Sequence, residues 1–365
     1  MSKRYSLCLL AACVLIVAPT AADRNARNVI LFLGDAGGLS TLHAASVHGH
    51  DKPNALFIQR MPYIGLMDTS AVDSWVTDSA NGMTAIVTGE KTKNGVISQS
   101  GDAVRGQSDG KPLKTILEHA EERGLSTGVI SNMSMADATP AACYAHSNDR
   151  NTAGEIFAQI LTPRFGDGVD LVIGGGRKAI YAATEKMGLQ LDAALNEKGY
   201  AVFDSVTAIP AGAKRVVALV DGADFELGPV VERAIGSLSR NPKGFFLMVE
   251  WDMHTIDLRR GLDRVLVMDR VIEQTARGAR ADTLIVFSAD HSFDIRLRGG
   301  KKGVPILPAE ETGEADPLKA NIRVDNGHTG EQVVVAARGP GAERVHGFFS
   351  NTDLFHIMMS AYGWE

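Results

Sequence analysis

The sequence predicts an α/β protein with a central, mostly parallel sheet and helices on both faces. Short apolar runs of strand length alternate with segments of helical periodicity along most of the chain. Several of the apolar runs end directly in glycine or in acidic residues, as buried parallel strands do where they enter tight loops. The length of 365 residues and the 45% hydrophobic composition suit a large core.

The first predicted strand, Asn28 to Leu33, is an apolar run that stops at Gly34 and Asp35. Similar runs predict strands at Ser126 to Ile130, Val169 to Ile173, Val216 to Val220, Phe245 to Val249, Thr283 to Phe287 and Val333 to Ala337. Ligands bind at the carboxyl edge of open parallel sheets. Asp35 therefore stands at a candidate binding edge, although a turn aspartate beside glycines is an equally ordinary explanation when it is taken alone.

Helical periodicity is clearest after Asp78 and Ser79, where apolar residues recur until Gly89 stops the run. The other predicted helices lie at Leu113 to Ala120, Ile156 to Leu161, Val230 to Leu238 and Leu262 to Gln274. The segment from Arg298 to Asn326 is rich in glycine and proline, which predicts a long surface loop.

The amino terminus predicts export. Residues 1–22 have two basic residues, an apolar run over residues 7–18 and a small-residue end at Ala22, which is typical of a cleaved signal peptide. The apolar run is too short for a membrane span. Lipoprotein processing at Cys13 is the weaker alternative, because the apolar run continues to Ala18. We expect a periplasmic or secreted protein with one main domain over residues 23–365.

Charge and cysteine content narrow the class further. The net charge of −6 gives no support for nucleic-acid binding, which usually needs a basic surface. Cys8 and Cys13 fall in the predicted leader, so the mature chain would keep only Cys143 and could form no internal disulfide.

Ser79 is a candidate nucleophile because it stands at a predicted helix start. Free N–H groups and the helix dipole favour negative charge there, which would stabilise both a serine alkoxide and a bound anion. For one Asp-Ser pair alone, an ordinary helix cap is the better explanation.

Five segments place metal-ligand side chains at or just after predicted strand ends, or beside predicted strands. They contribute Asp35; Asp137; Glu250 with Asp252, His254 and Asp257; Asp290 with His291; and His328. Histidine nitrogen mixed with carboxylate oxygen suits Zn²⁺, and a site richer in oxygen suits Mg²⁺. Arg150 has the planar fork that pairs with phosphoryl oxygens. His146 we interpret as structural.

These segments resemble the alkaline phosphatases. The resemblance is specific in VTDSA, DATPAA with Arg150 downstream, FFLMVE, ADH and HTG, and it runs in the family's order from Asn28 to about Tyr362. It implies an alkaline-phosphatase-like fold and the hydrolysis of small phosphate monoesters through a phosphoserine. It also implies two Zn²⁺ and one Mg²⁺, and a possible homodimer.

Residue by residue, the resemblance implies that Ser79 is the nucleophile and Arg150 the phosphate-binding arginine. It makes Asp35 a bridge between one zinc and the magnesium. The other implied ligands are Asp290 and His291 for that zinc, Thr139 and Glu250 for magnesium, Asp137 for magnesium through water, and His328 for the remaining zinc.

The loop after Glu250 departs from the family pattern. The family's aspartate and histidine at the fifth and ninth positions beyond the glutamate are Thr255 and Arg259 here. We predict that Asp252 and His254 replace them, with Asp257 as the reserve. The alternative is a polar loop with a helix cap, which would leave a weak third metal position.

A second departure is the short segment between Arg150 and Glu250. It predicts a reduced capping insertion, a more open entrance and a broad choice of substrate. Trp251 either forms a wall of the site or belongs to the core.

Three alternatives to a phosphomonoesterase stay open. Phosphodiesterases and sulfatases of the same superfamily have related metal sites, but the former usually present a threonine nucleophile and lack an arginine like Arg150. The modified motif that a sulfatase needs is not seen. A catalytically inactive metal or anion binder is favoured only by the altered loop after Glu250.

Overall fold

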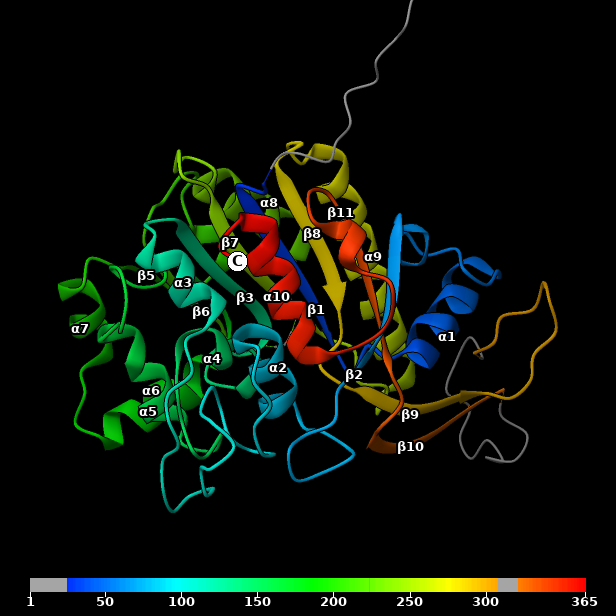
Figure 1. Ribbon diagram of the computed structural model, residues 1–365, viewed down its shortest axis with the longest axis horizontal. Coiled ribbons are helices and arrows are strands. Elements are labelled where there is room, and N and C mark those ends of the chain that lie inside the picture. Colours follow the sequence, from blue (N-terminus) through cyan, green and yellow to red (C-terminus); the bar gives the residue numbers. More distant parts are fainter. Residues whose placement is uncertain (1–24, 223, 308–320) are drawn as a thin grey trace, which may run out of the picture.

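A computed structural model describes residues 25–222, 224–307 and 321–365 (Figure 1). The predicted signal peptide, with Cys8 and Cys13, lies outside the described residues, as does part of the predicted loop from Arg298 to Asn326. Cys143 is a free, buried cysteine.

A ten-stranded sheet forms the centre of the molecule. Its strands stand in the order β12 (Gly347–Ser350), β2 (Tyr63–Asp68), β11 (Val333–Arg338), β8 (Thr283–Ser288), β1 (Asn28–Asp35), β7 (Phe245–Asp252), β3 (Ser126–Ser134), β4 (Leu171–Gly175), β6 (Val216–Leu219) and β5 (Ala201–Phe203). β11 runs antiparallel to both β8 and β2, and the other neighbouring pairs are parallel. The predicted, mostly parallel sheet is confirmed.

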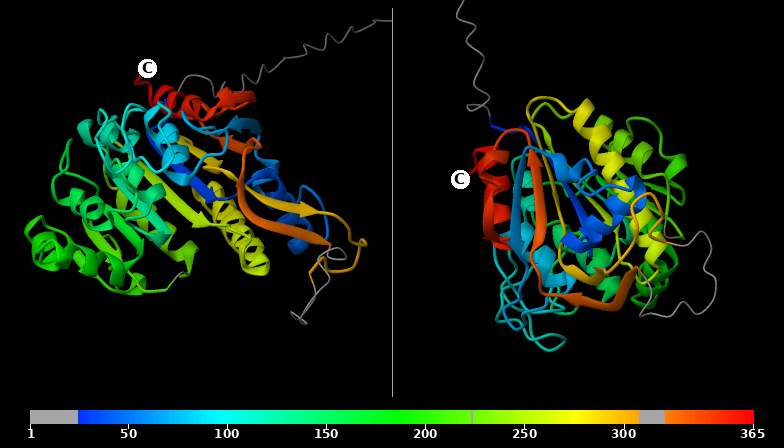
Figure 2. Two further views of the ribbon diagram at one scale, coloured as in Figure 1. Left: turned by 90° about the horizontal axis from the view of Figure 1, so that it is seen from below. Right: turned by 90° about the vertical axis from the view of Figure 1, so that its right-hand side faces the viewer.

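Helices cover both faces of this sheet, as the views in Figure 2 show. One face packs against α2 (Ser79–Thr88), α3 (Ile116–Glu122), α4 (Ala138–Tyr144), α5 (Ala153–Ala158), α6 (Arg177–Lys186), α7 (Leu191–Glu197) and α10 (Asn351–Tyr362). The opposite face packs against α1 (Leu39–His50), α8 (Leu227–Leu238) and α9 (Leu258–Gly278). Short 3₁₀ turns lie at Ile58–Arg60, Gln159–Leu161, Val206–Ala208 and Ala342–Arg344.

Strand β1 is buried along its whole length, because β7 and β8 flank it and helices cover both of its faces. Leu31 and Leu33 enter the core on the α2 face, and Ile30 and Phe32 enter the core on the α9 face. Each such side chain contributes roughly 1.5–3 kcal/mol on burial. Parallel pairing aligns the carboxyl ends of the three strands, so side chains that follow them meet at one edge.

A separate two-stranded sheet lies beside that edge (Figure 1). It pairs β9 (Ser292–Leu297) with β10 (Ile322–Thr329) in antiparallel register. The prediction of a loop reaching Asn326 is therefore wrong from Ile322 onward. Ile322 and Val324 pair with Leu297 and Ile295 of β9. The glycine and proline content of the segment gives no indication of this long-range strand pairing.

The helix caps agree with the sequence pattern in two places. Asp78 caps α2 by accepting from the Asn81 N–H, and Gly89 ends it in the left-handed conformation. The helix predicted from Leu113 begins later, because Thr115 and Glu118 form a capping box. Residues between Arg150 and Glu250 form α5 to α8 and strands β4 to β6, which extend the main sheet. No helix among the described residues is long and apolar enough to cross a membrane.

Candidate active site

Ser79 is the first residue of α2, and its side chain faces the carboxyl ends of the central strands. It is 5% exposed, and its Oγ lies 3.3 Å from His291 Nε2. One turn later, Gly82 allows α2 to lie against Asp290, since an added Cβ would come within 2.6 Å of the Asp290 carbonyl oxygen. The helix start therefore presents Ser79 directly to the residues that follow β8.

Three buried side chains form what we call the inner site: Asp35, Asp290 and His291. Asp35 ends β1, and the other two follow β8, the neighbouring strand. Their ligand atoms lie within 4.8 Å of one another, with His291 Nε2 3.2 Å from Asp35 Oδ1. Asp35 Oδ1 and Asp290 Oδ2 are buried and have no hydrogen-bond partner among the described residues. Two such carboxylate oxygens beside an imidazole fit a divalent cation.

The charges of the inner site are strongly coupled. Burial raises the pKa of Asp290, the nearby His291 opposes this, and the Asp35 carboxylate adds to it, which leaves the pKa at about 6. Burial opposes protonation of His291, but the Asp290 and Asp35 carboxylates raise its pKa to about 9. The pKa of Asp35 is lowered, because the surrounding histidines outweigh its burial. A cation here would replace the proton on His291.

His254 and His328 extend this group outward, and with Asp252 they form what we call the outer site. His254 follows β7, and His328 lies in β10. Their rings and that of His291 each offer a nitrogen within 4.8 Å of the others, and the His291 and His328 rings stack with centroids 3.7 Å apart. His291 Nδ1 lies 3.1 Å from the Ser292 carbonyl oxygen, and His328 Nδ1 lies 3.0 Å from that of Thr77. Nδ1–H donation to these carbonyls leaves each Nε2 free to bind a metal.

Asp252 and His254, the two predicted replacement ligands, do reach the site. Their ligand atoms form a candidate metal group with Asp35. The Asp252 carboxylate, however, already accepts from His254 and from Arg264. The reserve candidate, Asp257, is exposed and caps α9 by accepting from the Arg260 N–H.

The oxygen-rich side of the site lies along β7 and α4. Glu250 is 1% exposed and accepts from the Ser131 hydroxyl on the adjacent β3. Its pKa is raised by burial and then by the carboxylates of Asp35 and Asp137. Asp137 caps α4, and the buried Thr139 lies in the first turn of that helix, which packs against β3 and β7. Carboxylate and hydroxyl oxygens of this kind suit Mg²⁺.

Arg150 lies between the caps of two helices. Its Nη1 donates to Asp78 Oδ2 at 3.0 Å and its Nη2 to Asp137 Oδ1 at 2.8 Å. Burial disfavours the charged guanidinium, but these two carboxylates outweigh it and raise the Arg150 pKa. Asp78 was predicted only as a cap, and its second role in holding Arg150 has no signal in the local sequence.

The remaining predicted residues lie elsewhere. Thr255 is buried, whereas Arg259 faces a pocket beside α9. Trp251 points to the core on the opposite side of the sheet and packs edge-on against Phe225, so the core alternative is correct. His146 lies 2.8 Å from the Leu113 carbonyl oxygen and belongs to none of the candidate metal groups among the described residues.

The fold and the site together define a phosphatase-type enzyme, in which a helix-start serine and an arginine flank metal-ligand side chains at a sheet edge. A family model described as alkaline phosphatase matches residues 26–205, 221–321 and 310–364. The chain belongs to the alkaline phosphatase family. Membership implies hydrolysis of phosphate monoesters by an enzyme whose relatives depend on metal ions.

Individual relatives agree with this assignment. A tissue-nonspecific alkaline phosphatase of Felis catus is 27% identical over 92% of this chain and 83% of its own. Streptomycin-6-phosphate phosphatase of Streptomyces griseus is 29% identical, over 96% and 95% of the two chains. A solved mutant of TAB5 alkaline phosphatase, with magnesium bound in its M3 site, has a TM-score of 0.76 at 26% identity and covers 94% of this chain and 99% of that chain.

Chain length separates this protein from the feline relative. Their alignment runs over 437 residues, which exceeds the 365 residues of this chain. The relative therefore carries inserted residues that this chain lacks. The reduction of a capping insertion between Arg150 and Glu250 stays a prediction, because the alignment length does not locate the inserted residues.

Proposed function

We propose that this protein hydrolyses phosphate monoesters through a phosphoserine at Ser79, with two zinc ions and one magnesium ion at the site. The observation that carries the proposal is the pair of buried carboxylate oxygens, Asp35 Oδ1 and Asp290 Oδ2, which accept no hydrogen bond among the described residues and lie beside Ser79 and the imidazole of His291. Two buried carboxylates that share one imidazole are costly, and cations would neutralise them.

In this proposal each ion has its own set of side chains. Asp35, Asp290 and His291 would hold one zinc, His254 and His328 would contribute to the other, and Glu250, Thr139 and Asp35 would hold magnesium, with Asp137 acting through water. Bound ions of this kind neutralise charge on a transferring phosphoryl group and lower the pKa of the serine hydroxyl.

The chain's own residues carry the rest of the reaction. Ser79 Oγ forms a bond to phosphorus while the ester bond to the alcohol breaks, and the alcohol leaves with a proton. Water then attacks the phosphoserine, which releases inorganic phosphate and restores the Ser79 hydroxyl. Arg150 binds two phosphoryl oxygens, and its bonds to Asp78 and Asp137 aim its guanidinium before substrate arrives.

The substrate range is broad in this proposal, because no separate capping domain is built from the described residues between Arg150 and Glu250. One relative is named for streptomycin 6-phosphate, which is a phosphate monoester on a bulky molecule. A site with an open entrance would accept alcohols of similar size.

The test is hydrolysis of a chromogenic phosphate monoester and the matching diester, with zinc and magnesium present. We expect the monoester to be strongly preferred, and Ser79→Ala to lose a factor on the order of 10⁴ or more in kcat/KM. Full activity in Ser79→Ala would rule out the covalent route. A preference for the diester would favour a phosphodiesterase, and phosphate binding without turnover would favour an inactive binder.

A further inference from the structure

The three histidines around the outer site differ in what fixes their rings. His291 and His328 donate Nδ1–H to backbone carbonyls, whose positions are set by the fold. His254 has a side-chain partner instead, with Nδ1 2.8 Å from Asp252 Oδ1. A side chain can fix an imidazole only if that side chain is itself held.

Hydrogen bonds fix both the backbone and the carboxylate of Asp252. Its backbone N–H donates to Asn132 Oδ1 at 2.9 Å, and its Oδ1 also accepts the His254 backbone N–H at 3.0 Å. Its Oδ2 accepts from Arg264 Nη1. Both carboxylate oxygens therefore already bond to protein groups.

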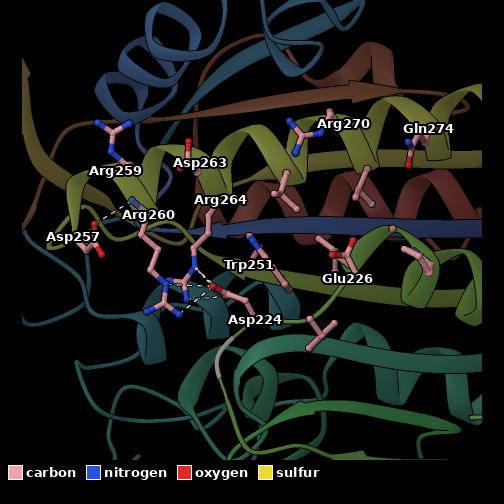
Figure 3. A pocket seen from close by; sticks show the side chains of 16 residues that line it. Asp224, Glu226, Trp251, Asp257, Arg259, Arg260, Asp263, Arg264, Arg270 and Gln274 are labelled. Atoms are coloured by element: carbon pink, nitrogen blue, oxygen red, sulfur yellow. Dashed lines mark hydrogen bonds and ion pairs between the residues drawn. The ribbon is translucent and has the colours of Figure 1, made fainter. Parts of the chain in front are cut away.

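Arg264 reaches Asp252 from α9, which covers the face of the sheet opposite Ser79. Its side chain is 9% exposed, and its Nη2 donates to Asp224 Oδ1 at 2.8 Å. Arg260 donates to the same carboxylate at 3.0 Å, but no bond from Arg260 to Asp252 exists among the described residues. Figure 3 shows the two arginines converging on Asp224 at the wall of a pocket of about 840 Å³.

We propose that Arg264 and Asp252 are positioning residues for a zinc ligand, His254, and that Asp252 does not itself bind zinc. Arg264 holds the Asp252 carboxylate, the carboxylate keeps the proton of His254 on Nδ1, and His254 binds the ion through Nε2. This inference rests on the proposed function, in which the outer site holds zinc. Carboxylates that fix a ligating histidine in this way also make its free nitrogen more basic.

The competing arrangement makes the opposite prediction. The ligand atoms of Asp35, Asp252 and His254 also lie within 4.8 Å of one another, so Asp252 could bind the ion directly, as the sequence pattern suggested. In that case Arg264 competes with zinc for the carboxylate, and removing Arg264 would strengthen zinc binding. In the proposed arrangement its removal weakens zinc binding.

The two arrangements can be separated by the zinc affinity of the full-length chain. This affinity is measured by competition with a chromophoric chelator. We expect Arg264→Ala to weaken the outer site by about 10- to 100-fold, and His254→Ala to abolish it. Arg260→Ala is the matched control, because Arg260 shares Asp224 with Arg264 but does not touch Asp252. It should leave zinc affinity unchanged. Unchanged or tighter binding in Arg264→Ala overturns the proposal, as does full zinc content in His254→Ala.

A second measurement uses the wild-type protein and needs no substitution of Arg264, Asp252 or His254. In zinc-loaded wild type, ¹⁵N NMR of His254 should show a protonated Nδ1 and a metal-bound Nε2. The reverse assignment, or a wild type that binds no zinc at the outer site, overturns the proposal. Both readouts are independent of turnover, so an enzyme that hydrolyses monoesters yet shows metal-bound Nδ1 would contradict this inference and leave the proposed function standing.

Discussion

The inner and outer sites share one sheet edge but are built in different ways. Asp35 and Asp290 follow adjacent central strands, whose pairing fixes their separation, and both are 5% exposed or less. His254 lies in a loop and His328 in the small two-stranded sheet, and both are only half-buried. Backbone register therefore sets the inner site, whereas in the outer site the ring of His254 depends on a side-chain bond to Asp252.

This difference predicts unequal sensitivity to substitution. The inner site should tolerate almost no change, because its carboxylate oxygens are buried and lie on paired central strands or directly after them. The outer site should be more adaptable, and this would explain how its ligands can depart from the pattern of the family while the inner ones do not.

The largest effect is expected for Asp35→Asn, because Asp35 would serve both the inner zinc and the magnesium. We expect kcat/KM for a phosphate monoester to fall by a factor on the order of 10⁴. Metal analysis should show the loss of more than one ion per chain. Near-normal metal content would show that the inner site does not depend on this carboxylate.

His254→Ala should have a smaller effect, because only the outer site would be damaged. We expect kcat to fall by about 10²- to 10³-fold, and each chain to lose one zinc ion. Asp257→Ala is the matched control in the same loop, since Asp257 only caps α9. Equal losses of kcat and zinc in the two variants would show that His254 acts no more as a ligand than Asp257 does.

Arg150→Ala tests a residue that is assigned as a ligand to none of the three metal ions. Two charge-assisted hydrogen bonds to the phosphoryl group would be lost, which predicts a drop of about 100-fold in kcat/KM. The metal content should stay unchanged. A variant that loses metal as well as activity would show that Arg150 supports the fold of the site and not only substrate binding.

The smallest effect concerns stability, and it depends on pH. Without metal, the pKa of His291 is raised from 6.5 to about 9, so its stabilising contribution is complete below pH 6.5 and is lost as the pH rises through 9. In the metal-loaded protein His291 is neutral because it binds the ion, so its contribution to stability is not lost as the pH rises. Removal of metal by a chelator should therefore lower the melting temperature more at pH 9 than at pH 6, by the equivalent of roughly 2–3 kcal/mol.

The opposite order, with a larger chelator effect at pH 6, would show that His291 is not protonated in the metal-free protein. His328 provides an internal comparison within the outer site. Its pKa is lowered by burial and by the nearby His291, so it adds no loss of stability over the same pH interval.

The sequence predicted the inner site well for a physical reason. Apolar runs such as Asn28 to Leu33 predict buried strands, and parallel strands end at one edge, so Asp35 and Asp290 could be placed together without a structure. The position of Ser79 followed equally from local signals, because Asp78 and Gly89 mark the two ends of its helix.

The outer site could not be predicted in the same way. The strand that carries His328 pairs with a segment about 30 residues earlier, and the intervening glycines and prolines predicted a loop instead. The bonds of Arg264 to Asp252 and Asp224 join helix α9 to strand β7 and to the loop before α8, and neither helical periodicity nor a motif indicates them. Local patterns locate strand ends, but long-range side-chain bonds depend on the packing of the whole fold.

In the proposed function Ser79 is activated at the inner site, where His291 lies beside its Oγ, whereas the outer site serves the later removal of the phosphoryl group. Acid quenching during turnover of a phosphate monoester, followed by mass spectrometry of the Ser79 peptide, tests this assignment in wild type and in His254→Ala. Phosphate should be found on Ser79 in both proteins and should accumulate in His254→Ala, where removal of the phosphoryl group is slowed. Absence of phosphoserine from both, or its presence on a different residue, would contradict the account.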